Sequence, residues 1–303
     1  MNAATEQTIL LIGQNGQVGW QLRRTLAPLG KIAAYDHPQM DLANPDQLRA
    51  IIAAVKPTLI VNAAAYTAVD KAEEEPDKAM AINGIAPGIL AEEAKKLGAG
   101  IIHYSTDYVF DGSKQTPYTE EDEPTPLNVY GQTKLAGDRA VAAAGAPYLI
   151  FRTSWVYGVR GNNFLRTLLR LFSEREEISI VDDQIGVPTW SRMIAEVTAQ
   201  TTALALAPAT RDLRLEDISG LYNLTASGET TWYGFAQAIA DHANHEHLSP
   251  KVAVIKPIPS SDYPTPAVRP PYGVLSHRKL KDTFGLVIPA WEQQLALCIQ
   301  PLT

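Results

Sequence analysis

The stretch Thr8-Ile-Leu-Leu-Ile-Gly-Gln-Asn-Gly-Gln-Val-Gly19 joins a short apolar run to a glycine-rich loop, and a helical pattern follows through Leu22 and Leu26. A continuous apolar run is typical of a strand buried in a parallel sheet. Glycines at such a turn let the backbone approach a pyrophosphate, whose charge is stabilised at the helix N-terminus. Because the spacing is G-x-x-G-x-x-G, an ordinary strand–helix turn is the alternative. We predict that a dinucleotide contacts Gly13, Asn15, Gly16, Gln17, Val18 and Gly19.

Strand-like and helix-like segments alternate through the first half of the chain. Apolar runs predict further strands at 31–36, 57–62, 100–104 and 147–152, and helices are predicted at about 44–55 and 76–97. This alternation favours an α/β fold with a doubly wound parallel sheet and right-handed crossovers. Ligands of such sheets bind beyond the carboxyl ends of the strands. The residues of interest should therefore follow strands.

The pattern loosens from about residue 162, with a strand predicted at 178–181, helices near 190–206 and 231–243, and another strand at 220–224. We therefore predict a dinucleotide-binding Rossmann domain in residues 1–160. Residues 161–303 should form a smaller, mainly substrate-binding region, with some segments returning to the first domain.

Two predicted strands end in residues suited to a dinucleotide. Asp36 lies 17 residues beyond Gly19, near the position where an acid binds the adenosine ribose hydroxyls. Its carboxylate would face a 2′-phosphate, which favours NADH over NADPH; a surface aspartate opening a turn is the alternative. After the third strand, small side chains let a flat cofactor approach the backbone at Ala63, Ala64 and Ala65.

The stretch Leu127–Arg139 places Tyr130 four residues before Lys134, so that a helix would present both on one face. A nearby ammonium makes a phenol easier to ionise. Ser105 and Thr106 follow the predicted strand at 100–104. Such a set can polarise a carbonyl and protonate the alkoxide that hydride attack produces. Tyr-x-x-x-Lys also occurs by chance, but its agreement with the N-terminal loop favours catalysis.

Composition excludes several classes of protein. Hydrophobic residues make up 46% of the 303 and charged residues 19%, which is typical of a globular chain. The net charge of −7 argues against a nucleic-acid surface. The single cysteine excludes an intramolecular disulfide. The polar start of the chain excludes a signal peptide, and no apolar run approaches the ~20 residues of a membrane span. We expect a cytoplasmic protein without membrane or nucleic-acid partners.

Some isolated residues admit two interpretations. Trp155 can wall a pocket or pack in the core. Arg269, in the proline-rich segment 260–272, can bind a diphosphate bidentately or remain solvated. His242, His245 and His247 suggest a metal site, but no carboxylate completes it, and we expect them to be solvated.

Longer stretches resemble the extended short-chain dehydrogenases/reductases, and within them the reductases of dTDP-linked 4-keto sugars. The resemblance extends from residue 13 to residue 292. It is carried by 13–19, 62–73, 103–110, 127–137, 151–157, 183–189 and 263–270.

The resemblance implies hydride transfer from NADPH or NADH to C4 of dTDP-4-dehydro-β-L-rhamnose, giving dTDP-L-rhamnose for cell-surface polysaccharide. By position, Thr106 would orient the keto oxygen and Tyr130 would protonate it. Lys134 would hold the nicotinamide ribose and lower the pKa of Tyr130. Matches on the adenosine side are Asp41 and Leu42. Positions near the sugar nucleotide are Thr67, Val69, Asp107, Val109 and Trp155.

Departures from the pattern separate the alternatives. Related dehydratases carry a glutamate where this chain has Tyr108, so reduction fits better than elimination or epimerisation. Some similar reductases bind Mg²⁺ between the two subunits of a homodimer. Glu292 matches one ligand, but Gln21 stands where an acid is expected, which argues against Mg²⁺. Regulatory subunits with this fold are non-catalytic; the intact tyrosine, lysine and threonine argue against that alternative.

Overall fold

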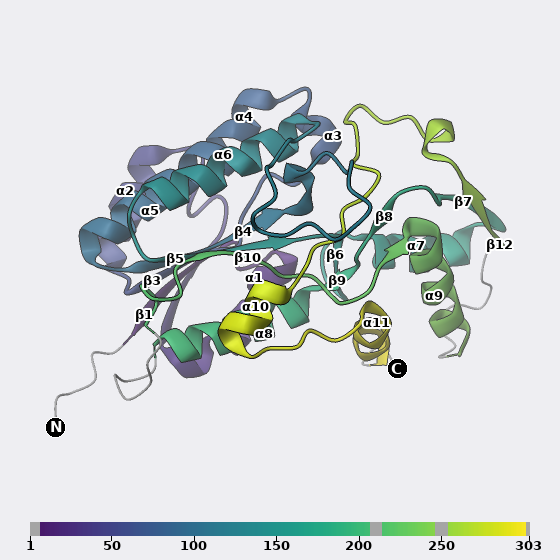
Figure 1. Ribbon diagram of the computed structural model, residues 1–303. Helices are drawn as coiled ribbons and strands as arrows, with labels where there is room; N and C mark the ends of the chain where they lie inside the picture. Colours follow the sequence, from purple (N-terminus) through teal and green to yellow (C-terminus); the bar gives the residue numbers. More distant parts are fainter. Residues whose placement is uncertain (1–6, 207–213, 246–253, 301–303) are drawn as a thin grey trace.

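The computed structural model describes residues 7–206, 214–245 and 254–300 (Figure 1). In its first half strands and helices alternate as the sequence predicts. These elements are β1 (Thr8–Ile12), α1 (Gln17–Thr25), η1 (Ala27–Leu29), β2 (Lys31–Tyr35), α2 (Pro45–Val55), β3 (Leu59–Asn62), α3 (Val69–Ala72), α4 (Pro76–Met80), η2 (Ala81–Ile85), α5 (Ala86–Leu97), β4 (Gly100–Thr106), η3 (Asp107–Val109), α6 (Val129–Ala143) and β5 (Tyr148–Thr153).

The second half has shorter strands and more irregular connections. Its elements are β6 (Val156–Tyr157), α7 (Phe164–Glu174), β7 (Glu177–Val181), β8 (Ile185–Gly186), β9 (Thr189–Trp190), α8 (Ser191–Ala205), β10 (Gly220–Asn223), β11 (Thr230–Thr231), α9 (Trp232–His245), β12 (Val254–Ile258), η4 (Ser260–Asp262), α10 (Arg278–Phe284) and α11 (Trp291–Ile299).

The main sheet of the described residues has six parallel strands in the order β10-β5-β4-β3-β1-β2. The chain runs outward from β1 to β2 and then returns to the other side of β1 as β3. This reversal opens a crevice at the carboxyl ends of β1 and β3, which is where doubly wound sheets bind ligands. The predicted fold class is confirmed.

Helices cover both faces of the sheet, with α2 to α6 on one side and α1, α8 and α10 on the other (Figure 1). Alternate residues of β1 serve the two faces. Ile9 packs into the cluster with Leu22 of α1, and Leu10 packs into the cluster with Leu48 of α2. Because both faces of the sheet are covered, its strands must be apolar at nearly every position. The first strand could therefore be predicted from its apolar run in the sequence.

A third core lies beyond the sheet and joins α7, α9 and α11 through aromatic residues such as Tyr157, Phe172 and Phe235. Strand β12 pairs with β7 apart from the main sheet. Strand β10 does join the main sheet, and α8 and α10 lie on it. The division into domains at residue 160 stays a prediction.

The long helix predicted at 76–97 is interrupted by the π-helical turn η2. Pro87 has no N–H to donate to the carbonyl of Asn83, four residues earlier, which explains a local break in the helix. The side-chain amide of Asn83 accepts a hydrogen bond from the Tyr66 N–H and donates to the Tyr66 carbonyl and the Thr133 hydroxyl. The turn therefore ties the segment after β3 to helix α6.

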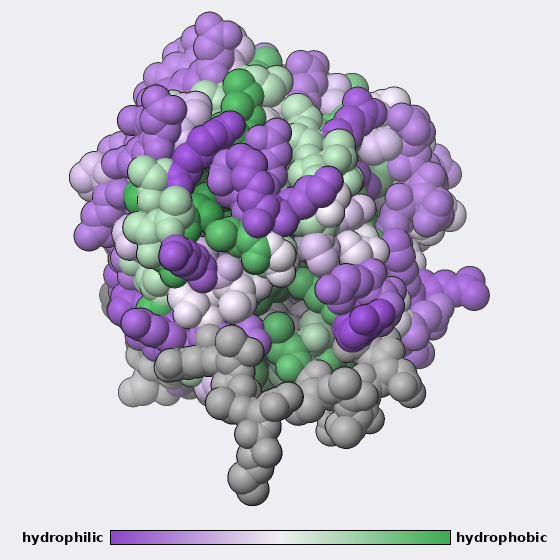
Figure 2. All heavy atoms as spheres, turned by 90° about the vertical axis from the view of Figure 1, so that its left-hand side faces the viewer, coloured by the Kyte–Doolittle hydropathy of each residue, from purple (hydrophilic) through white to green (hydrophobic). Residues whose placement is uncertain are grey.

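Figure 2 shows the side of the molecule that lies at the left in Figure 1. Hydrophilic side chains cover most of this side, and apolar side chains appear in a hollow between them. None of the described helices combines the length and apolar character needed to cross a membrane.

Candidate active site

The glycine loop lies at the crevice between β1 and β3. Gly13 has a φ of +84°, and a Cβ there would lie 2.7 Å from the Ala64 nitrogen. A Cβ on Gly19 would collide with the carbonyl of Gly13. Gly13 therefore permits the turn and the approach to β3, while Gly19 lets α1 pack on the loop. Helix α1 begins at Gln17, and Gly16 before it supplies no side-chain cap, so the first N–H groups of the helix are available to an anion.

A cleft of about 430 Å³ extends from this loop along the strand ends. We call it the glycine-loop cleft. Its lining residues are Gly13, Gly16, Gln17, Val18, Asp36, Ala63, Ala64, Ala65, Thr67, Tyr104, Ser105, Tyr130, Lys134, Thr153, Val156, Gly161 and Asn162. Most of the predicted cofactor-binding residues thus lie in one cleft. Thr153 supplies a further observation, because its buried Oγ1 has no hydrogen-bond partner among the described residues. An elongated cleft with free helix N–H groups and an unpaired hydroxyl fits a dinucleotide.

The remaining predicted cofactor residues have different surroundings. Asn15 donates its backbone N–H to Asp36 (2.8 Å), whose other oxygen accepts from the His37 N–H (2.9 Å). Asp36 therefore fixes the loop as well as facing the cleft. Asp41 and Leu42 are not among the lining residues: Asp41 accepts from the Ala43 N–H, and Leu42 is buried in a core cluster.

Helix α6 carries Tyr130 and Lys134 to the floor of the cleft. It begins after Asn128, whose side chain accepts from the Gly131 N–H (2.8 Å). The Thr106 hydroxyl lies close enough to the Tyr130 hydroxyl to influence the pKa of that phenol. The Lys134 ammonium donates to the carbonyl of Tyr104 (2.6 Å). The structure thus brings the three predicted catalytic residues together at the end of β4.

The electrostatics of the pair differ from the expectation that Lys134 lowers the pKa of Tyr130. Burial raises the pKa of Tyr130 above its ordinary value, and only the neighbouring Thr106 hydroxyl opposes this. Burial also lowers the pKa of Lys134 to about 8, against the influence of Asp138. The expectation that Tyr130 ionises more easily was wrong for the protein alone, because desolvation raises its pKa and Lys134 is not among the groups that shift it.

Asp107 directly follows Thr106 and is buried. Its carboxylate accepts a hydrogen bond from the Thr106 hydroxyl (3.1 Å). Burial raises the pKa of Asp107 to about 7. The chain passes so close at Gly273 that a Cβ there would lie 2.6 Å from the Asp107 carboxylate. A carboxyl group that is protonated near neutrality can donate as well as accept a hydrogen bond at this position.

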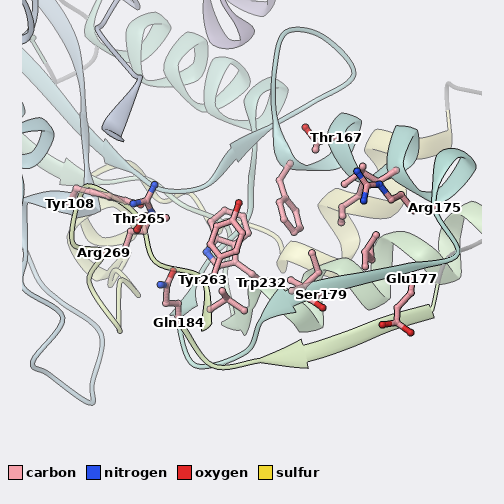
Figure 3. Close-up of a pocket in the computed structure, with 16 residues that line it drawn as sticks. Tyr108, Thr167, Arg175, Glu177, Ser179, Gln184, Trp232, Tyr263, Thr265 and Arg269 are labelled. Atoms are coloured by element: carbon pink, nitrogen blue, oxygen red, sulfur yellow. The ribbon is translucent and has the colours of Figure 1, made fainter. Parts of the chain in front are cut away.

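A second cavity, of about 710 Å³, adjoins the first, and we call it the lateral pocket. Its lining residues are Tyr108, Phe164, Thr167, Leu168, Leu171, Arg175, Glu177, Ile178, Ser179, Ile180, Val181, Gln184, Trp232, Tyr263, Thr265 and Arg269. The rings of Tyr108 and Tyr130 meet edge to face, with centroids 5.6 Å apart. Since each ring lines one cavity, the two cavities meet at this pair. Tyr108 and Arg269 lie at one end of the lateral pocket and Arg175 at the other (Figure 3).

Sequence reasoning missed most of this pocket. Trp232 stacks on Trp155 with ring centroids 3.6 Å apart, and Trp155 itself has a φ of +42°. Trp155 was predicted near the sugar nucleotide. Gln184 and Tyr263 lie in stretches that carry the family resemblance but were given no role, and Trp232 carried no signal beyond being aromatic. Of the other predicted substrate residues, Thr67 lines the glycine-loop cleft, Val69 begins α3 and Val109 is wholly buried in the core.

Arg269 faces a carboxylate in this structure. Its guanidinium forms a bidentate pair with Asp70, at 2.7 and 2.6 Å. The backbone N–H of Ala267 reaches the same carboxylate (3.2 Å), and the Asn128 amide donates to the Val268 carbonyl (2.8 Å). The segment 263–273 is therefore fastened across the sheet ends and forms one wall of the lateral pocket.

No group of three His, Cys, Asp or Glu side chains suited to a metal ion occurs in the part of the chain that the structure describes. Gln21 is half-buried on α1 and Glu292 is exposed on α11. His242 is half-buried on α9, whereas the His245 side chain and the whole of His247 lie outside the described residues.

The crevice with its glycine loop and the Tyr-x-x-x-Lys helix beside β4 define an extended short-chain dehydrogenase/reductase. The sequence profile described as the RmlD substrate binding domain matches residues 7–303. The chain belongs to this family.

Individual relatives match over almost their whole length. The chain is 48% identical over 297 residues to the dTDP-4-dehydrorhamnose reductase of Burkholderia thailandensis, covering 97% of this chain and 98% of that protein. It is 45% identical over 288 residues to the enzyme of the same name from Escherichia coli K12, covering 94% of each. A crystal structure of the dTDP-4-dehydrorhamnose reductase of Bacillus anthracis in complex with NADP is 34% identical, with a TM-score of 0.88 over 98% of this chain and 100% of that one.

Proposed function

We propose that this protein is a dTDP-4-dehydrorhamnose reductase, which reduces the C4 ketone of dTDP-4-dehydro-β-L-rhamnose with NAD(P)H to give dTDP-L-rhamnose. The observation that carries the proposal is the placement of Tyr130, with the Thr106 hydroxyl beside it, at the junction of the two cavities. A ketone at this junction would lie beside two hydroxyls, with cofactor and substrate arriving from different sides. The full-length similarity to reductases of this name supports the same activity.

The glycine-loop cleft would hold the cofactor, with the pyrophosphate at the start of α1 and the nicotinamide end toward Lys134. When bound, the reduced nicotinamide supplies the hydride. NADP in the similar Bacillus anthracis enzyme supports NADPH as a donor. Both Asp36 oxygens already accept backbone N–H groups, which reduces the negative potential that a 2′-phosphate would meet, so we propose that both coenzymes are used.

The lateral pocket would hold the dTDP part of the substrate. Its volume is in the range of pockets that bind molecules of this size, and it combines aromatic walls with cationic groups. Trp232 and Tyr263 offer flat faces for a base, while Arg269 and Arg175 offer charge for a diphosphate. Arg269 would exchange or share its bond to Asp70 when an anion enters.

The residues at the junction would control the proton. The Thr106 hydroxyl would orient the ketone oxygen, and Tyr130 would give its proton to that oxygen as C4 gains the hydride. A raised pKa keeps Tyr130 protonated before the reaction, as a proton donor must be. Lys134, which lies on the same helix face, would then stabilise the phenolate that remains.

The test is a coupled measurement of cofactor and sugar. Purified protein should consume one NADPH or NADH per molecule of dTDP-4-dehydro-β-L-rhamnose and yield dTDP-L-rhamnose, as identified by chromatography and NMR. A non-catalytic binding subunit would leave the cofactor unchanged. An epimerase or dehydratase would alter the sugar without net oxidation of the cofactor. Either result would reject the proposal.

Two further statements stay predictions. A cytoplasmic location fits a protein that draws on reduced nicotinamide and nucleotide sugars. A homodimer is to be tested by the mass of the protein in solution.

A further inference from the structure

A buried polar track runs beneath Lys134 that neither the hydride nor the proton step uses. Asn62 ends β3 and His103 lies opposite it on β4, since the two residues are partners in the parallel register. The Asn62 amide nitrogen lies 3.2 Å from His103 Nδ1, and His103 Nε2 lies 3.3 Å from Lys134 Nζ. All three side chains are at most 2% exposed. Buried polar groups of this kind must satisfy one another.

The hydrogen-bond directions in this track are interdependent. Asn62 Oδ1 accepts the Ala64 N–H (3.3 Å), so the Asn62 NH₂ group faces His103 and donates to Nδ1. A neutral imidazole carries only one proton, which must then be on Nε2 and points at Lys134. If Lys134 were an ammonium, two N–H donors would face each other. A neutral Lys134 amine can instead accept a hydrogen bond from the Nε2–H group of His103.

A charged Lys134 requires the opposite arrangement. Its ammonium would donate to Nε2, so that His103 would carry its proton on Nδ1. Asn62 would then turn its oxygen toward His103 and give up the Ala64 N–H. Because Ala64 lines the glycine-loop cleft, the charge of Lys134 is linked to the cleft wall.

The other groups around Lys134 are few in the described part of the chain. Asp138, one turn further along α6, is the acid that favours the charged lysine. It is itself bonded by Ser105 of β4 (2.7 Å) and lies 3.5 Å from Arg152 of β5. Tyr104 offers only its carbonyl. These contacts use only Oδ2 of Asp138, and its buried Oδ1 has no hydrogen-bond partner among the described residues. His103 is the titratable side chain within hydrogen-bond distance of Nζ.

We propose that Asn62 and His103 are positioning residues that fix the direction of the Lys134 amine and couple its protonation to the tautomer of His103. The inference rests on the proposed function only in treating Lys134 as a residue of the reductase site. Burial and the charge of Lys134 hold the pKa of His103 well below its ordinary value, so His103 stays neutral while Lys134 titrates.

The test is a pH series of nitrogen-15 NMR spectra of the unliganded protein with labelled histidine, from about pH 6.5 to about pH 9.5. The His103 signals are assigned from a His103→Gln sample. We expect Nε2 to carry the proton at high pH and Nδ1 at low pH, with a midpoint near the Lys134 pKa of about 8. One tautomer throughout, or conversion to imidazolium, would overturn the proposal.

Two variants separate coupling from a merely structural role. Lys134→Met should leave His103 in a single tautomer over the whole series; a change that persists would show that another group drives it. Asn62→Asp cannot donate to Nδ1, so His103 should carry its Nδ1 proton at every pH. In the pH profile of kcat, one limb is set by the ionisation of Lys134. The Asn62→Asp variant should raise the apparent pKa of that limb by about one pH unit. Since the spectra need no turnover, their outcome is independent of whether the reductase assay succeeds.

Discussion

The two cavities that meet at Tyr108 and Tyr130 are built in different ways. The glycine-loop cleft is lined mainly by residues that follow β1 and β3, lie at the end of β4 or belong to α1 and α6. The lateral pocket takes its walls from α7, β7, the start of α9 and the segment 263–269, which are far apart in the sequence. Chemistry shared by a whole class can therefore be encoded locally, while recognition of one substrate depends on tertiary assembly.

The largest effect should come from the junction itself. Tyr130→Phe removes the proton donor and should lower kcat by about 10³-fold, while the dissociation constant of NADPH stays nearly unchanged. Tyr108→Phe is the matched control, because it keeps the ring that packs on Tyr130 and should retain most turnover. Steady-state kinetics and cofactor titration measure both. Full activity of the Tyr130 variant would show that the proton does not come from the tyrosine at the point where the two cavities meet.

How far the cleft could be predicted follows from its construction. Gly13 and Ala63 each follow a strand and Thr106 ends one, and strand ends are visible as the end of an apolar run. The spacing of Tyr130 and Lys134 needs only one helix. The wrong expectation concerned the pKa of Tyr130, because spacing reveals a neighbouring charge but not burial.

The next effect concerns Asp107, which connects the end of β4 to the wall formed near Gly273. The pKa of Asp107 rises from 3.8 to about 7 on folding. Above pH 7 the ionised form costs stability, and below about pH 4 the cost vanishes because both states are protonated. Asp107→Asn should thus stabilise the protein by about 4 kcal/mol at pH 8 and much less at pH 4.

Denaturant unfolding at the two pH values measures this difference. Asp111→Asn is the control of opposite sign, since hydrogen bonds from Ser113 help to lower the pKa of Asp111. That variant should lose stability at neutral pH. Equal destabilisation of both variants at pH 8 would contradict the account of Asp107.

A smaller effect should distinguish two glycines of the glycine loop, Gly16 and Gly19. Gly19→Ala forces a Cβ onto the Gly13 carbonyl and should cost about 2 kcal/mol of unfolding free energy. Gly16→Ala meets only the Gly13 oxygen at 3.3 Å and should cost clearly less. Thermal unfolding compares them. If both variants unfold at the same temperature, Gly19 does not have the packing role described.

The smallest effect belongs to the lateral pocket. Arg269→Lys keeps the charge but loses the bidentate bond to Asp70, so the KM for the sugar nucleotide should rise about tenfold with little change for NADPH. Arg278→Lys, in an exposed pair with Asp282, should change neither constant. A rise confined to the KM of NADPH would assign Arg269 to the other cavity.

The lateral pocket resisted prediction for physical reasons. Trp232 and Trp155 are 77 positions apart, and only the packing of α9 against the end of β5 brings their rings together. The pairing of β12 with β7 likewise depends on contacts outside either segment. The π-turn before Pro87 differs, because the proline that explains it is visible in the sequence. The track from Asn62 to His103 could be suspected from polar residues in apolar strands, but it required the register of β3 and β4.

The most direct measurement follows the hydrogen itself. The protein is supplied with dTDP-4-dehydro-β-L-rhamnose and NADPH that carries deuterium in the transferable position, and the product is read by NMR. The account predicts deuterium at C4 of dTDP-L-rhamnose and almost no labelled product from Tyr130→Phe. Deuterium that stays on the cofactor, or enters the sugar at another carbon, would contradict it.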